Sequence, residues 1–112
     1  MSNSANRKKW TVMIYLAGDN NLDANGVIDL TEMKKSGSTA EVNVIAQFDR
    51  AGADLPTKRY FLRKGTSLNA DVVESLGETN TGQPEFLLDF IKWGSARYPA
   101  DYYALILWNH GQ

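Results

Sequence analysis

The only histidine of the chain, His110, follows a run of apolar residues and precedes a glycine. An imidazole exchanges protons near neutral pH, so it can act as a general acid or a general base. Gly111 lets a substrate approach the backbone closely, and its N–H can stay free to donate to an oxyanion. The pair has the residue types for acid–base catalysis, although a lone histidine at the end of a strand is more often a surface or capping residue.

A second polar group begins with Asp19 and Asn20, directly after another apolar run. Asp and Asn favour turns, so turn formation is the ordinary explanation for them. The stretch also looks like the start of a calcium loop, but Ala24 and Leu30 stand where that loop needs a glycine and a bidentate acid. An EF-hand is therefore rejected. Asp19 and Asn20 remain candidates for shaping a crevice or orienting His110.

Strands are predicted directly before both polar groups. Nearly continuous apolar runs over 10–18, 41–49 and 101–109 are typical of strands that are covered on both faces, as in parallel sheets. The segments 58–64 and 71–78 are short and half polar, and they are interpreted as a peripheral, hairpin-like excursion.

Helices are predicted between these strands. Apolar residues at helical spacing indicate a helix over 23–36, and Gly37 fits its end. A second helix is expected to begin near Pro84 and to end before Pro99. The tryptophans of the second helix and the third strand are expected in the core, and the Lys and Arg side chains on solvated faces.

Alternating strands and helices indicate an α/β fold with a parallel sheet and helices on its faces. If the strand over 10–18 is central, strand order reverses between its end and the end of the strand over 101–109. Ligands bind at such a switch point, beyond the carboxyl ends of the strands. We therefore expect Asp19, Asn20 and His110 to meet in one crevice.

Composition narrows the class of protein. The 112 residues carry 12 basic and 13 acidic side chains without an extended basic patch, so nucleic-acid binding has no electrostatic basis. The absence of cysteine excludes disulfides and a cysteine nucleophile within this sequence, and a zinc site would need carboxylates almost alone. No apolar run is long enough to span a bilayer, and the polar first residues show no signal peptide.

Three stretches together resemble one family. They are KKWTVMIYLAGDNNLD, VNVIAQFDR and YYALILWNHG, and they are similar to the N-terminal half of clostripain-like cysteine peptidases. The resemblance implies a caspase-like three-layer αβα sandwich with a mostly parallel sheet. This chain would hold about three core strands and a short peripheral hairpin of it. We expect a disordered segment over 1–8 and the N-terminal half of a peptidase domain over 9–112.

The resemblance also implies roles. His110 would help to activate a cysteine thiol and protonate the leaving amine, and the Gly111 N–H would help to stabilise the oxyanion. The cysteine would come from the downstream half of the precursor or from a heavy chain, and cleavage of peptide bonds after Arg or Lys is expected. The enzyme that gives the family its name depends on calcium and matures into two chains. The resemblance is therefore compatible with calcium as a cofactor and with processing to a light chain. It is also compatible with a secreted or cell-envelope location.

Alternatives remain at this point. A caspase-like module that has lost catalysis would keep the fold as a binding surface, and its downstream segment would have another residue in place of the cysteine. A small flavodoxin-like domain could bind an anion in the same crevice, but no glycine-rich phosphate loop follows the first strand. The third strand is strongly apolar, and an exposed apolar edge strand invites aggregation. Two interpretations fit such a strand: the light chain of a processed two-chain peptidase, and a truncated form of a longer protein.

Overall fold

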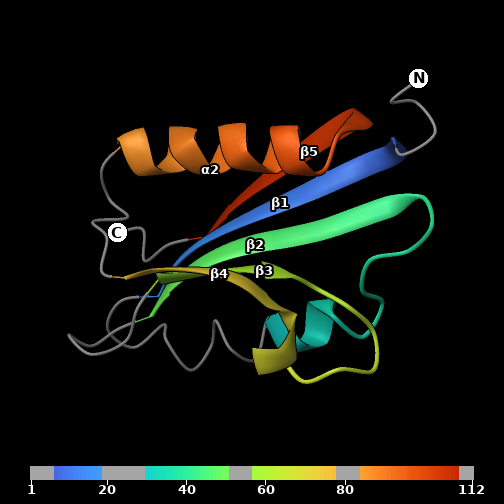
Figure 1. The fold of residues 1–112 in the computed structure, drawn as a ribbon, viewed down its shortest axis with the longest axis horizontal. Coiled ribbons are helices and arrows are strands. Elements are labelled where there is room, and N and C mark those ends of the chain that lie inside the picture. The colour runs from blue at the N-terminus through green and yellow to red at the C-terminus, as the bar shows by residue number, and fades with distance from the viewer. Residues whose placement is uncertain (1–6, 19–29, 51–56, 78–83, 109–112) are drawn as a thin grey trace.

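The computed structural model describes residues 7–18, 30–50, 57–77 and 84–108 (Figure 1). Its centre is a five-stranded sheet in the order β4-β3-β2-β1-β5. The strands are β1 (Lys8–Gly18), β2 (Val42–Arg50), β3 (Thr57–Phe61), β4 (Val72–Gly77) and β5 (Ala100–Trp108).

The first strand has the central position that the switch point requires. β1 pairs in parallel with β2 on one side and with β5 on the other, as the pairs Met13↔Ile45 and Met13↔Leu105 show. Each strand was predicted from its apolar run, and β1 begins two residues earlier than expected.

The half-polar segments form an antiparallel pair, β3 with β4, as predicted. The pair extends the main sheet, because β3 is also hydrogen-bonded antiparallel to β2. Two of the four strand pairings are thus parallel and two are antiparallel, and Tyr60 and Leu62 of this region are buried.

The two faces of the sheet carry separate cores, because side chains alternate along each strand. Ile14 and Leu16 of β1 face a cluster that includes Leu30, while Met13 and Tyr15 face a cluster that includes Phe90. Helical segments therefore cover opposite faces, as Figure 1 shows for α2 and for residues 30–33.

The helix α2 (Pro84–Arg97) matches the predicted second helix. Proline suits its first turn, and Arg97 lies in its last turn, where a positive charge favours the helix dipole. Gly94 lets α2 approach the sheet closely, because a Cβ there would lie 2.7 Å from the side chains of Met13 and Ile45. Among the described helices, none is long and apolar enough to cross a membrane.

The predicted first helix lies only partly within the described residues. Residues 30–33 are helical and residues 34–36 form a turn. Gly37 has a φ of 63°, and its N–H donates to the carbonyl oxygen of Met33 at 3.1 Å. Such a left-handed glycine is a common helix end, so the predicted end at Gly37 is confirmed.

Candidate active site

The sheet has one edge at which the three parallel strands end together. In the parallel registers Gly18 lies opposite Arg50, and Leu16 lies opposite Trp108. Because parallel neighbours run in the same direction, the carboxyl ends of β1, β2 and β5 share this edge. β1 is flanked by β2 and β5, so strand order reverses here and the predicted switch point exists.

The four predicted site residues lie just outside the described residues. Asp19 and Asn20 directly follow β1, and His110 and Gly111 come shortly after β5. The structure therefore gives the order and direction of the strands that lead to these residues, but no contacts of their side chains. Among the described residues, no group of three or more His, Asp or Glu side chains lies close enough to hold a metal ion.

A buried arginine supports the sheet beside α2. The guanidinium of Arg59 donates to Gln47 Oε1 at 2.8 Å, to Glu74 Oε1 at 3.2 Å and to Asp89 Oδ2 at 2.7 Å. Its side chain is 4% exposed, and its Cζ lies 4.7 Å from the centre of the Trp93 ring. This one residue therefore links β2, β4 and α2.

The expectation that Lys and Arg side chains lie on solvated faces is wrong for Arg59 and Lys34. Both are buried, and both are paired with carboxylates. Their partners come from distant parts of the chain, so neither burial leaves a local pattern in the sequence. Trp93 packs partly buried against the core, as predicted.

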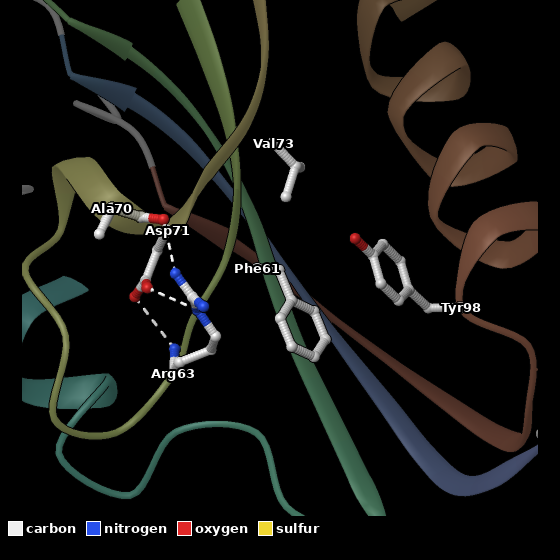
Figure 2. A pocket seen from close by; sticks show the side chains of 6 residues that line it. All are labelled: Phe61, Arg63, Ala70, Asp71, Val73 and Tyr98. Atoms are coloured by element: carbon white, nitrogen blue, oxygen red, sulfur yellow. Dashed lines mark hydrogen bonds and ion pairs between the residues drawn. The ribbon is translucent and has the colours of Figure 1, made fainter.

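A pocket of about 370 Å³ is lined by Phe61, Arg63, Ala70, Asp71, Val73 and Tyr98 (Figure 2). Tyr98, one of its lining residues, precedes the start of β5, and its carbonyl oxygen accepts a hydrogen bond from Thr11 Oγ1 near the start of β1. Tyr98 stacks on Phe61 with ring centres 5.1 Å apart, and burial raises the pKa of its phenol, although the charge of Arg97 opposes the shift. The pocket therefore lies toward the amino ends of the parallel strands, opposite the candidate edge.

β5 forms the open side of the sheet and exposes apolar side chains on both faces. Leu105 and Leu107 project to the face of α2, and Tyr102 and Ile106 project to the other face. Their exposed fractions range from 42% to 56%. A strand with this composition is typical of the interior of a sheet, where both faces are covered.

The model of the clostripain family matches residues 14–112. The chain belongs to the clostripain family. Clostripain of Hathewaya histolytica is 32% identical over 98% of this chain, and the match covers 25% of clostripain itself. The chain thus spans about a quarter of the length of this clostripain relative.

Solved clostripain-like structures share the fold. A clostripain from Bacteroides thetaiotaomicron, in complex with the peptide inhibitor BTN-VLTK-AOMK, has a TM-score of 0.77 and 13% identity, and the match covers 95% of this chain and 93% of that chain. An inactive zymogen C11 protease from Parabacteroides distasonis has a TM-score of 0.69 and 26% identity, over 95% of this chain and 32% of that chain. The α/β fold implied by the clostripain-like motifs is thereby confirmed.

Proposed function

We propose that the chain is the histidine-bearing part of a cysteine endopeptidase and that His110 is its acid–base residue. The observation that carries the proposal is the parallel pairing of β5 with β1, in a chain that matches the clostripain family through residue 112. Because of this pairing, the ends of β1 and β5, which Asp19 and His110 follow in sequence, share one edge of the sheet, and this supports the proposal.

Chain geometry limits where His110 can be. It is two residues from Trp108, and two residues of extended chain reach about 7 Å at most. On this ground we propose that His110 acts at the carboxyl edge, where β1 and β5 both end. A crevice there would bring an imidazole and a carboxylate within reach of one substrate.

The proposed reaction is hydrolysis through a thioester. A thiolate attacks the carbonyl carbon of the scissile peptide, and the Gly111 N–H donates to the oxyanion that forms. The imidazolium of His110 then protonates the leaving amine, and the neutral imidazole takes a proton from the water that hydrolyses the thioester. Each proton transfer is suited to a group with a pKa near neutrality.

The thiol is proposed to come from another part of the same precursor, because this sequence has no cysteine. The matched chain of the Bacteroides thetaiotaomicron clostripain has nearly the length of this chain, whereas the matched zymogen chain is about three times as long. This difference supports a precursor that is cut into a light and a heavy chain. The open side of β5 is the surface on which the remainder would pair.

The proposed substrates are peptides and proteins that are cut after Arg or Lys. The resemblance to the family is also compatible with calcium as a cofactor. The inhibitor bound to the Bacteroides thetaiotaomicron clostripain has lysine before its AOMK group, in keeping with such a preference. No residue described in this chain is assigned to the specificity pocket.

Labelling of the full-length protein tests the proposal. A peptide with lysine before a thiol-reactive group should add its mass to a cysteine outside these residues. His110→Ala should lower kcat at least about a thousandfold, while Lys35→Met, on an exposed side chain, should leave it unchanged. Turnover that survives in the His110→Ala variant would remove His110 from the mechanism. Absence of any labelled cysteine would leave the fold as a non-catalytic module.

A further inference from the structure

A buried ammonium group holds the connection between β3 and β4. The side chains of Lys34 and Asp71 are 6% and 0% exposed, and Lys34 Nζ lies 3.1 Å from Asp71 Oδ2. Lys34 Nζ also donates to the carbonyl oxygen of Arg63 at 2.5 Å, to the carbonyl oxygen of Thr66, and to Thr66 Oγ1 at 3.2 Å. Four oxygen atoms of one short loop therefore surround a single cation.

Asp71 ties the same loop from its other side (Figure 2). Its Oδ2 accepts from the backbone N–H of Arg63, and its Oδ1 accepts from Arg63 Nε, both at 3.0 Å. Thr66 Oγ1 lies 2.5 Å from Asp71 Oδ1. Burial would raise the pKa of Asp71, but the hydrogen bonds from Thr66, the Arg63 backbone, Lys34 and the Arg63 side chain outweigh it and lower the pKa.

Gly37 closes the loop against the end of the first helix. A Cβ at Gly37 would lie 2.6 Å from the backbone nitrogen of Lys64 and 3.0 Å from the carbonyl carbon of Arg63. The Ser38 N–H donates to the carbonyl oxygen of Leu62 at 2.8 Å. The peptide bond between Arg63 and Lys64 is thus packed against backbone on one side and bonded to an ammonium group through its oxygen.

The sequence of this loop, Arg63-Lys64-Gly65-Thr66, is exposed and contains two bonds that follow basic residues. Exposed turns are preferred sites of proteolytic cutting, and a protease needs its substrate in an extended conformation. The Arg63 carbonyl oxygen would also have to leave Lys34 before it could enter an oxyanion hole. Cutting after Arg63 therefore requires Lys34 to release the Arg63 carbonyl oxygen first. Cutting after Lys64 requires the opening of a loop that Lys34 holds on both sides of this bond, at Arg63 and at Thr66.

We propose that Lys34 and Asp71 form an internal clamp that makes the Arg63–Lys64 and Lys64–Gly65 bonds resistant to peptidases specific for Arg and Lys. The clamp matters because the peptidase to which this chain is proposed to belong would itself cut after Arg and Lys. This part of the inference rests on the proposed function. The exposed basic loop can then persist in the presence of the active enzyme.

Limited proteolysis with trypsin tests the clamp without using the chain's own activity. The test uses full-length protein with His110→Ala, alone and combined with Lys34→Met or with the matched control Lys35→Met. Lys35 is the neighbouring lysine, with a side chain that is 68% exposed. Mass spectrometry follows the fragments that end at Arg63 or Lys64, and circular dichroism shows whether each variant is folded.

The Lys34→Met variant should be cut at these two bonds at least about tenfold faster than its parent, since cutting follows the population of the opened loop. The Lys35→Met variant should stay within about twofold of the parent. A folded Lys34→Met protein that is cut at the parental rate would overturn the clamp.

If Lys34→Met does not fold, hydrogen exchange of the parent protein tests whether the clamp holds the loop closed. The Arg63 amide should then exchange as slowly as amides of the central strands, and exchange as fast as in an exposed turn would overturn the clamp. Active protein with Lys34→Met should cut itself at the same bonds. If trypsin cuts this variant faster but the active protein does not cut itself, the clamp stands and the proposed Arg/Lys specificity fails.

Discussion

The two sides of the sheet are completed in different ways. On the β3–β4 side, the chain buries two cations and pairs them with carboxylates, so that loops, strands and helices are tied together. On the β5 side, large apolar side chains stay exposed on both faces. The first side is completed by contacts within the chain, whereas the second has the composition of a strand that is covered on both faces. An exposed apolar edge strand indicates an interaction surface more strongly than a charged one does, because exposure of apolar side chains to water is unfavourable.

The largest effect is expected from a charge on the open side. Leu105→Asp would place a carboxylate on the face shared with α2, where the rest of the precursor is proposed to pack, and burial of an unpaired charge costs several kcal/mol. We expect loss of assembly and of activity, measured by copurification of the two chains and by peptide hydrolysis. Val73→Asp is the matched control, because Val73 is 39% exposed on β4 at the opposite edge and Leu105 is 42% exposed.

If Leu105→Asp assembles as well as Val73→Asp does, the difference between the two sides disappears and β5 is not the interface. The comparison is direct because both variants add the same charge to an exposed apolar position on an edge strand.

A smaller effect is expected from Arg59 on the completed side. Arg59→Met would leave the buried Gln47 Oε1 without its donor, and an unsatisfied buried polar group costs roughly 1–3 kcal/mol. Thermal unfolding should show a loss of this size. Asp89→Asn should cost less than about 1 kcal/mol, because the Asp89 side chain is 68% exposed. Equal losses in both variants would mean that the exposed ion pair, rather than the buried contact, stabilises this side.

The smallest effect is expected from pH. The pKa of Asp71 is lowered in the folded chain, so its contribution to stability is complete above its unfolded value near 3.8 and is lost as pH falls through the folded pKa. The stability difference between the parent and Asp71→Asn should therefore be constant from pH 5 to 7 and should shrink below about pH 4, by on the order of 1–2 kcal/mol. Chemical unfolding across this range measures it, and a difference that grows on acidification would contradict the assignment.

The sequence predicted the parts of the fold that are determined by local patterns. Apolar runs predicted β1, β2 and β5, and helical spacing with Pro84 predicted α2. Gly37 was predicted as the end of the first helix, and its positive φ agrees with that role. The burial of Lys34 and Arg59 could not be predicted, because their partners lie 37 and 30 positions away at Asp71 and Asp89 and no periodicity connects them.

The candidate site was predicted in its topology rather than in its contacts. The order β2-β1-β5 confirms the switch point to which Asp19 and His110 are adjacent in sequence. Hydrogen bonds of these residues stay predictions, since both lie outside the described part of the chain.

The register of β1 with β5 also bears on the order of folding. Trp10 pairs with Tyr102, 92 positions later, whereas Tyr60 pairs with Val72, only 12 positions later. Closing the longer loop costs more chain entropy, so we expect the β3–β4 hairpin to form early and the β1–β5 pairing late. The proposed peptidase, assembled in this order, would have no functioning centre while its own loops are still unfolded.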